Sequence, residues 1–396
     1  MTLQFPPDFM WGAATAAHQI EGNNTNSDRW TVETQPNSRM TEPSGDACDS
    51  LHRWAEDLDL VAAMGLNAYR FSIEWARIEP APGMVSRAML DHYRRIIEGC
   101  FERGITPVVT LHHFTLPKWV ARLGGWSSED SPSLFARYVA AVGPILDGVE
   151  WVCTINEPNM VALVTAVIKA QGAVTFDSVE PDPTVTARLI DAHRAARGEL
   201  VGLTGVKSGW TVANQDAQAA DAGSESTVRA DAWRWQREDQ YLTVCAEDDF
   251  IGVQAYSRQI IGPSGWVAPG PETRRTLMDW EFYPDALEHA VRHTAELLPR
   301  VPILVTENGI ATGNDDDRID YTQNALIGLH RAMADGVDVR GYLHWSLLDN
   351  YEWGSFTPTF GLVAVDHGTF VRTLKRSGQW YGRVATSNAL PAAGRD

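Results

Sequence analysis

The chain has 396 residues and carries 33 basic against 51 acidic side chains, which gives a formal net charge of −18. With 44% hydrophobic and 21% charged residues, the composition excludes a disordered or fibrous protein and predicts a large buried core. The acidic balance would repel a phosphate backbone, so we expect no nucleic-acid partner. A membrane helix needs about 18 uninterrupted apolar residues, and no segment of the sequence offers them, so we expect no membrane partner.

The start of the chain and its cysteines bear on location. Residues 1–10 lack both the basic start and the apolar run of a secretory signal. The cysteines are scattered and form no CxxC pair, which is typical of a reducing compartment. We therefore expect a cytoplasmic protein with four buried thiols, at Cys48, Cys100, Cys153 and Cys245. The sequence carries no signal for an oligomeric state.

Short apolar runs alternate with helical patterns along the whole chain, as in βα units on a parallel sheet. We expect eight strands, at residues 11–15, 68–71, 106–111, 151–155, 209–212, 250–253, 303–306 and 341–343. Apolar residues recur between them at helical spacing, in residues 51–61, 90–101 and 325–333. The pattern favours a closed (β/α)8 TIM barrel of the α/β class over a doubly wound sheet. Without a linker or a repeat, residues 1–396 are expected to form one domain.

Three polar segments are predicted to be surface loops. Residues 23–44 and the Ala/Asp/Ser-rich residues 213–226 lack a helical or strand pattern, and we expect both to be mobile. The run Asn314-Asp-Asp-Asp317 lacks the glycine and the closing glutamate of a calcium loop. It is therefore predicted to be a solvated loop after the seventh strand, without a metal.

Polar and aromatic residues collect where the predicted strands end. In a barrel all strands end at one face, where active sites lie, so we expect these residues to converge on one pocket. The adjacent histidines His112 and His113 have no third ligand at a suitable spacing, so we predict no zinc site. The collected residues are Gln19, Glu21, Arg70, His112, His113, Asn156, Glu157, Tyr256, Glu307, Asn308 and Trp345.

Two carboxylates stand out in this set. Glu157 follows the fourth predicted strand and Glu307 follows the seventh, so the two could meet over a bound glycosidic bond. A single glutamate at such a place would more often cap a helix or pair with an arginine, but two at matching strand ends favour catalysis. Carboxyl groups about 5–5.5 Å apart give retention, and groups about 6.5–9.5 Å apart give inversion. The residues alone leave both outcomes open.

Six motifs occur in order along the chain: WGAATAAHQIE (11–21), YRFSIEW (69–75), TLHH (110–113), TINEP (154–158), TENG (306–309) and WSLLDNYEW (345–353). With them the chain resembles the family 1 glycoside hydrolases over about residues 9–381. The resemblance implies a retaining exo-β-glycosidase on a TIM barrel that needs no cofactor. Its partner would be a small β-glycoside or an oligosaccharide.

The resemblance also implies catalytic roles. Glu307 of the TENG motif would be the nucleophile and Glu157 of the NEP motif the acid/base. Arg70 and Tyr256 would contact the nucleophile, and Asn156 would bind the sugar 2-OH. For this chemistry the pKa of Glu157 should lie well above the ordinary value of about 4.3, while Glu307 stays ionised.

Sugar recognition falls, by the same resemblance, to polar and aromatic residues around the pocket. Glu352 would disfavour a 6-phosphate by charge repulsion, so we expect a non-phosphorylated sugar, glucose first, with galactose or fucose also accepted. Trp345 would form the floor beneath the sugar ring, and Trp280 would lie on the leaving-group side. The remaining predicted contacts are Gln19, His113 and Trp353.

The chain departs from the family pattern in several places. Phe114-Thr115 replaces the usual Trp-Asp, and Gln254-Ala255 precedes Tyr256 where Asn-Tyr is typical. The segments after Glu157 and around the fifth strand are shorter than usual. The resemblance therefore does not predict which leaving group the protein prefers.

Three alternatives accompany the favoured β-glucosidase. An endo-acting barrel hydrolase would share the two glutamates but lack the set of Gln19 and Glu352. A catalytically weak, glycan-binding relative would have lost one glutamate, and both are present here. A transglycosidase would have the same residues, because it differs only in whether water or an alcohol completes the second step.

Overall fold

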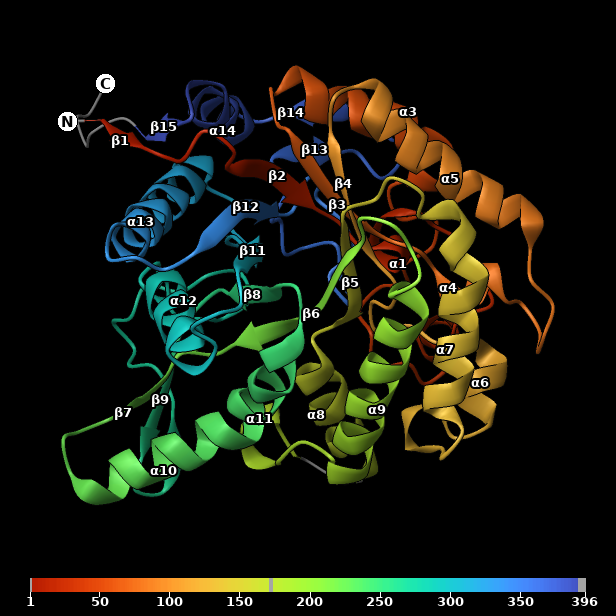
Figure 1. The fold of residues 1–396 in the computed structure, drawn as a ribbon. Helices are drawn as coiled ribbons and strands as arrows, with labels where there is room; N and C mark the ends of the chain where they lie inside the picture. The colour runs from red at the N-terminus through yellow and green to blue at the C-terminus, as the bar shows by residue number, and fades with distance from the viewer. Residues whose placement is uncertain (1, 171–173, 391–396) are drawn as a thin grey trace.

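The computed structural model describes residues 2–170 and 174–390. Eight parallel strands close into a barrel, in the order of the chain, with helices around the outside (Figure 1). This confirms the TIM barrel and each of the eight expected strands. They are β2 (Met10–Ala14), β3 (Ala68–Ser72), β4 (Thr106–Thr110), β5 (Trp151–Asn156), β6 (Lys207–Asn214), β8 (Ile251–Ala255), β11 (Ile303–Asn308) and β12 (Val339–Trp345).

Helices connect successive strands and turn an apolar face towards them. In α5 (Arg87–Glu102), Tyr93, Ile97 and Cys100 are buried at helical spacing, while Phe101, expected on the same face, is 45% exposed. The other helices are α1 (Ala17–Ile20), α2 (Asp28–Glu33), α3 (Ser50–Ala63), α4 (Trp75–Ile78), α6 (Lys118–Arg122), α7 (Ser131–Val142), α8 (Pro158–Lys169), α9 (Pro183–Leu200), α10 (Ser224–Arg234), α11 (Gln240–Leu242), α12 (Ala286–Leu297), α13 (Asp315–Ala334) and α14 (Arg376–Ser387). Short 3-10 or π turns are η1 (Gly125–Ser127), η2 (Gly143–Ile145), η3 (Phe176–Ser178), η4 (Trp235–Asp239) and η5 (Thr243–Glu247).

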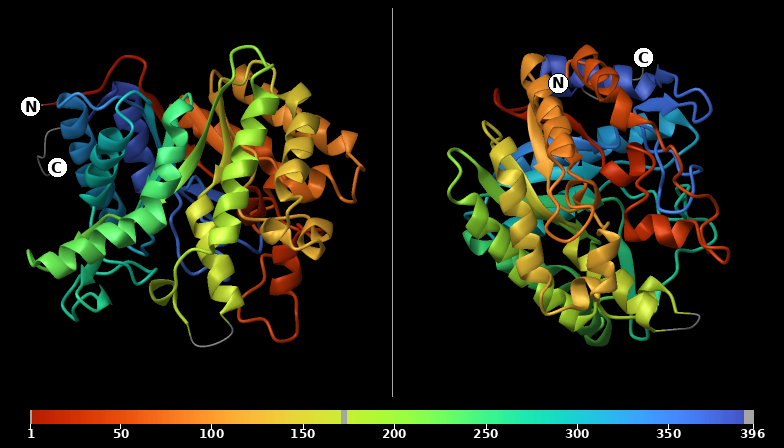
Figure 2. Two further views of the ribbon diagram at one scale, coloured as in Figure 1. Left: turned by 60° about the horizontal axis from the view of Figure 1, so that its bottom comes forward. Right: turned by 90° about the vertical axis from the view of Figure 1, so that its right-hand side faces the viewer.

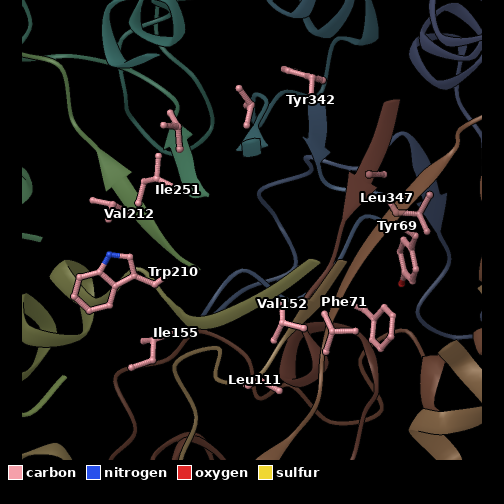
Figure 3. Packing of buried hydrophobic residues seen from close by; sticks show 14 of the residues in the cluster. Tyr69, Phe71, Leu111, Val152, Ile155, Trp210, Val212, Ile251, Tyr342 and Leu347 are labelled. Carbon is pink, nitrogen blue, oxygen red and sulfur yellow. The ribbon is translucent and has the colours of Figure 1, made fainter. Parts of the chain in front are cut away.

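The core lies on both sides of the barrel wall. Every residue of β2, β3, β5, β8 and β11 is buried, because these strands have side chains of the barrel interior on one face and helices on the other. Figure 3 shows buried residues of several strands in one cluster, among them Tyr69, Phe71, Val152 and Val212. This rigid wall fixes the strand ends, from which the candidate site residues project.

Three small sheets accompany the barrel in the part of the chain that the structure describes. β1 (Leu3–Gln4) and β15 (Ala389–Leu390) pair and bring the two ends of the chain together (Figure 1). β13 (Val363–Val365) pairs with β14 (Arg372–Leu374). β7 (Ala217–Ala219), β9 (Gln259–Gly262) and β10 (Gly265–Val267) form a third sheet, and α10 extends from the barrel beside it (Figures 1 and 2).

The prediction that residues 213–226 form a surface loop was therefore wrong in part. β6 continues to Asn214, β7 follows, and α10 begins at Ser224. Ala217 is buried and pairs with Gln259 of β9. An alanine-rich segment carries no strand signal of its own, so the pairing with β9, distant in sequence, determines this structure.

The prediction that residues 23–44 form a surface loop was also wrong in part. They contain α2, whose first turn is capped by the Ser27 side chain, which accepts a hydrogen bond from the Trp30 amide. Glu33 is buried, with His18 Nε2 at 2.7 Å and the Ser44 hydroxyl donating to its other oxygen at 2.6 Å. The polar composition did not predict this burial, because the side chains form their hydrogen bonds with one another inside the protein.

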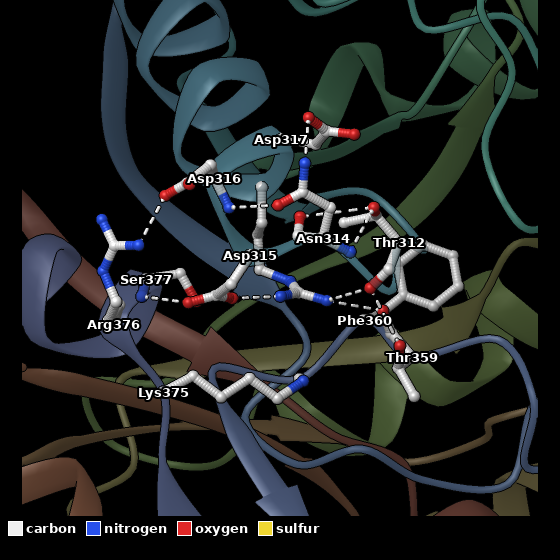
Figure 4. A network of polar contacts seen from close by, with 12 residues as sticks. Thr312, Asn314, Asp315, Asp316, Asp317, Thr359, Phe360, Lys375, Arg376 and Ser377 are labelled. Atoms are coloured by element: carbon white, nitrogen blue, oxygen red, sulfur yellow. Dashed lines mark hydrogen bonds and ion pairs between the residues drawn. The ribbon is translucent and has the colours of Figure 1, made fainter.

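Residues 314–317 begin a helix and are not the predicted loop. Asn314 caps α13 by accepting a hydrogen bond from the Asp316 amide, and three aspartates occupy the first turn, where the helix dipole favours negative charge. Figure 4 shows Asp315 beside Ser377 of α14, which donates to it at 2.7 Å. The acidic run thus joins two helices.

The four cysteines are buried and unpaired, as expected. A cytoplasmic location, expected from this cysteine usage, stays a prediction.

Within residues 2–170 and 174–390, no helix combines the length and the apolar character that crossing a bilayer requires.

Candidate active site

A cavity of about 460 Å³ lies at the carboxyl ends of the barrel strands. Arg70 and Asn156, both fully buried, lie in the wall behind it. Nine further side chains predicted for the site line the cavity together, although they come from distant parts of the sequence: Gln19, His113, Glu157, Tyr256, Trp280, Glu307, Trp345, Glu352 and Trp353. Glu21, His112 and Asn308 were also expected in the pocket but do not line it, and Glu21 instead pairs with Arg77 and accepts a hydrogen bond from the Tyr93 hydroxyl.

Glu307, at the end of β11, is held by two donors. Arg70 Nη1 lies 2.5 Å from one carboxylate oxygen, and the Tyr256 hydroxyl donates to the other at 2.6 Å. Burial raises the pKa of Glu307, and these two contacts oppose the rise by stabilising the carboxylate. Breaking such a buried ion pair would cost about 3–5 kcal/mol. The carboxylate is therefore fixed in place, and the two donors favour its ionised form.

Glu157 lies between β5 and α8 in a different environment. Among the described residues no side chain donates a hydrogen bond to its carboxyl group. Burial raises the pKa of Glu157 well above its ordinary value, and the nearby Glu307 carboxylate raises it further. Of the two glutamates, Glu157 therefore retains its proton at higher pH.

Three side chains of the cavity wall have backbone in the left-handed region. The φ angles are +67° at Phe114, +45° at Glu157 and +50° at Trp353. This conformation is costly for residues other than glycine and is found at functional sites, where the surrounding fold enforces it. Here it turns the chain sharply at the end of β5 and in the loops that follow β4 and β12, and it directs the side chains into the cavity.

The side-chain amide of Asn156 is oriented by three donors. Its oxygen accepts hydrogen bonds from Arg70 Nη2 at 2.5 Å, Gln254 Nε2 at 2.9 Å and the Thr211 hydroxyl at 3.1 Å. Its Nδ2 is buried without a protein partner. The amide therefore presents a free donor. Gln254, a departure from the family pattern, is part of this arrangement.

Gln19, Trp345 and Glu352 form a hydrogen-bonded cluster. Gln19 Nε2 donates to Glu352 at 3.2 Å, and Trp345 Nε1 donates to the other carboxyl oxygen at 3.1 Å. Burial and the Glu307 carboxylate raise the pKa of Glu352 to about 8. The side chain is therefore largely neutral near pH 7, which weakens the expected charge repulsion of a 6-phosphate. Gln19 Oε1 remains an unsatisfied acceptor.

Aromatic rings surround this cluster. His113 stacks within 18° on Trp345 and within 13° on Trp353, at centroid distances of 6.0 and 6.4 Å. Burial lowers the pKa of His113 well below its ordinary value, so the ring is neutral and can donate or accept one hydrogen bond. Phe114 packs edge-on against Trp353. Thr115 points elsewhere and donates to Glu74.

The side of the cavity near Trp280 is mainly apolar. Trp280 packs near Tyr256.

Several residues of the cavity wall were not predicted from the sequence. Met160 and Val164 lie one turn apart on α8, and their spacing after Glu157 could have indicated them. Arg29, whose guanidinium lies over Trp353 at 5.5 Å, carries no such signal. The other unpredicted residues are Met40, Phe114, Phe176, Met278 and Phe360.

One group in the described part of the chain has metal-ligating side chains close together, namely His193, Cys245 and Asp248. Arg197 already lies 3.0 Å from Asp248, and His193 bonds the Thr154 hydroxyl. Burial raises the pKa of Cys245 well above its ordinary value, so its thiol is protonated. The group is better explained as a buried ion-pair network than as a metal site.

A parallel barrel that carries two buried glutamates of unequal pKa among stacked aromatic rings defines a barrel glycosidase. Comparison with known families agrees, since the model of glycosyl hydrolase family 1 matches residues 1–201 and 234–390. The chain belongs to this family and is a glycosidase. Cleavage with retention of configuration is general to the family.

Individual relatives extend this finding. A bifunctional β-D-glucosidase/β-D-fucosidase of Bifidobacterium breve is 32% identical over 459 aligned positions, covering 98% of this chain and 100% of the relative. A β-glycosidase of known crystal structure is 40% identical, with a TM-score of 0.89 and coverage of 99% of each chain. A β-glucosidase of Thermotoga maritima, solved in complex with glucoimidazole, is 28% identical, with a TM-score of 0.89 and coverage of 97% and 99%.

These alignments also bear on the shortened segments. An alignment of 459 positions is longer than the 396-residue chain, so the relative has segments that this chain lacks. The family model leaves residues 202–233 unmatched, and these include β6 and β7. The chain therefore departs from the family's sequence pattern around its fifth barrel strand.

Proposed function

We propose that this protein is an exo-acting β-glucosidase that hydrolyses non-phosphorylated β-D-glucosides, with β-D-fucosides as further substrates. The observation that carries the proposal is the cluster of Gln19, Trp345 and Glu352, because paired amide and carboxyl groups over an aromatic plane suit the hydroxyl groups and apolar face of a terminal sugar. The similarity to a bifunctional glucosidase/fucosidase supports both sugars.

Glu307 and Glu157 divide the chemistry. Glu307, ionised beside Arg70, attacks the anomeric carbon, and the protonated Glu157 gives its proton to the departing oxygen. Glycosylation removes the charge of Glu307, so the pKa of Glu157 falls, and Glu157 then accepts a proton from the attacking water. One carboxyl group thus serves as acid in the first step and base in the second.

Asn156 is proposed to stabilise the transition state, in which positive charge develops on the sugar ring. Its free Nδ2 donates to the 2-oxygen of the sugar, a contact that strengthens towards the oxocarbenium-like transition state. Interactions gained only in the transition state raise kcat and leave KM largely unchanged. Asn156 should therefore influence the rate more than binding.

A panel of aryl glycosides tests the proposed function. We expect fast release from the β-glucoside and the β-fucoside, and slower release from the β-galactoside. The 6-phospho-β-glucoside should be a poor substrate, because a phosphate has no cationic partner in the cluster of Gln19, Trp345 and Glu352. Initial rates at fixed pH give the comparison. Turnover of the phosphorylated sugar alone, or of a cellotrioside but no monosaccharide glycoside, would contradict it.

Gln254 is expected to act as a positioning residue for Asn156. Gln254→Leu removes one of the three donors that orient the amide, so we expect kcat to fall about tenfold with little change in KM. The matched control is an aryl 2-deoxy-β-glucoside, which lacks the oxygen that Asn156 contacts. An equal fall with this substrate would mean that Gln254 supports only the fold.

A further inference from the structure

Tyr256, which donates a hydrogen bond to Glu307, lies just beyond the end of a barrel strand. The pairing of β8 with β11 ends at Gln254, and its pairing with β6 ends at Ala255. Tyr256 is the next residue, and its side chain is only partly buried. Because the strand ladder ends before Tyr256, the place of its hydroxyl, 2.6 Å from the Glu307 carboxylate, depends on other contacts.

A tyrosine of the neighbouring helix α13 supplies one of these contacts. The Tyr321 hydroxyl donates to the backbone carbonyl of Tyr256 at 2.7 Å and accepts a hydrogen bond from Asn308 Nδ2 at 3.3 Å. The same Nδ2 donates to the carbonyl of Ala255 at 2.6 Å. Two successive carbonyls at the end of β8 are therefore each held by a side chain, one from α13 and one from the end of β11.

Tyr321 is itself fixed in place. It is fully buried, and its ring packs edge-on against Phe282 with the ring centroids 5.4 Å apart. Burial raises the pKa of Tyr321 above its ordinary value, so the hydroxyl stays protonated near neutral pH and remains a donor. Tyr321 does not line the catalytic cavity. Any influence of this residue on the substrate must therefore pass through another side chain.

We infer that Tyr321 is a positioning residue for the reaction, because its bond to the Tyr256 carbonyl keeps the Tyr256 hydroxyl on the Glu307 carboxylate. The inference rests on the proposed β-glucosidase function, in which Glu307 is the nucleophile. Without the Tyr321 hydroxyl the segment after β8 gains freedom, and the contact between Tyr256 and Glu307 is made for less of the time. The nucleophile is then less well oriented and ionises only at a higher pH.

Other charged or titratable groups also face Glu307 and influence its ionisation. They are Arg70, Cys153, Glu157 and Glu352. Among the described residues, the hydrogen bonds of the Tyr321 side chain join it only to Asn308 and Tyr256. Removal of its hydroxyl therefore leaves the direct contacts of these four groups unchanged and acts on the contribution of Tyr256.

The pH dependence of kcat/KM for a dinitrophenyl β-glucoside tests the inference. This leaving group needs no proton, so the acid limb of the profile reports the ionisation of Glu307. Tyr256→Phe removes the donor, and we expect the limb to move up by about one pH unit. Tyr321→Phe should move it by about half a unit and lower the plateau about fivefold. The smaller shift is expected because the Ser257 hydroxyl also anchors this segment, donating to the Glu281 carbonyl at 2.8 Å.

Two further variants separate positioning from a loss of stability. If Tyr321 acts through the Tyr256 hydroxyl, Tyr321→Phe should change the rate of Tyr256→Phe by less than about twofold. Tyr381→Phe is the matched control, since this tyrosine is equally buried and its hydroxyl also donates to backbone carbonyls, those of Gly12 and Tyr342. It should keep the profile of the unmodified protein.

The shape of the profile makes the outcome decisive. A loss of folded protein would lower the rate at every pH but would not move the acid limb. A limb that Tyr321→Phe leaves in place, or single-variant effects that multiply in the double variant, would overturn the inference. Hydrolysis of the dinitrophenyl glucoside by the unmodified protein tests the proposed function separately.

Discussion

Replacement of Glu307 by glycine is expected to lower the turnover of aryl β-glucosides by at least about 10⁴-fold. The reason is that, among the described residues, no other carboxylate accepts the hydrogen bonds from Arg70 Nη1 and the Tyr256 hydroxyl that hold Glu307. The variant leaves a space beside the Arg70 guanidinium that suits a small anion. Azide or formate should therefore restore a substantial part of the activity, measured as the rate of aryl glucoside cleavage against anion concentration.

A buried glutamate outside the cavity provides the control for this variant. Glu238 is buried and accepts a hydrogen bond from the Gln215 amide, so Glu238→Gln should keep most of the activity. Rescue by the anion also shows that the Glu307 variant is folded. A folded Glu307→Gly variant that retained its activity, or that no anion restored, would contradict the nucleophile role.

Replacement of Glu157 by alanine should have an effect that depends on the leaving group. For an alkyl glucoside, whose departing oxygen needs a proton, we expect a loss of about 10²–10⁴-fold in kcat/KM. For a dinitrophenyl glucoside, whose leaving group departs as an anion, formation of the glycosyl-enzyme should change little. Single-turnover rates with the two substrates give the comparison.

The pH dependence of the unmodified protein follows from the same residue. Glu157 acts as an acid only when protonated, so the rate with alkyl glucosides falls as the pH rises through its pKa. Burial and the Glu307 carboxylate raise that pKa, so the fall should occur well above pH 4.5.

In the comparison of the two leaving groups, an equal loss of activity with the alkyl and the dinitrophenyl glucoside in Glu157→Ala would contradict the role of Glu157 as the acid.

The barrel and its strand ends could be predicted because they depend on local pattern. Apolar runs buried on both faces, as in β5 and β11, differ from their helical neighbours within a few residues. Once the strand count gives a barrel, its topology places Glu157 and Glu307 at the same face. The convergence of these residues thus needed no knowledge of distances.

Other features depend on partners distant in sequence. Glu33 and Ser44 are polar residues of a segment predicted to be exposed, and their burial follows from hydrogen bonds with each other and with His18. Gln254 was noted only as a departure, and its contact with Asn156 exists because β5 and β8 face the same barrel interior. The pKa of Glu352, about 8, likewise reflects burial that the sequence does not reveal.

The most direct test of the account is the anomeric configuration of the glucosyl azide that each glutamate variant forms, determined by NMR. In Glu307→Gly, azide takes the place of the nucleophile and attacks from the α face, so the product should be the α-glucosyl azide. In Glu157→Ala, azide attacks the glycosyl-enzyme on Glu307 from the opposite face, so the product should be the β-glucosyl azide. The same configuration from both variants, or the reverse assignment, would contradict the roles proposed for Glu307 and Glu157.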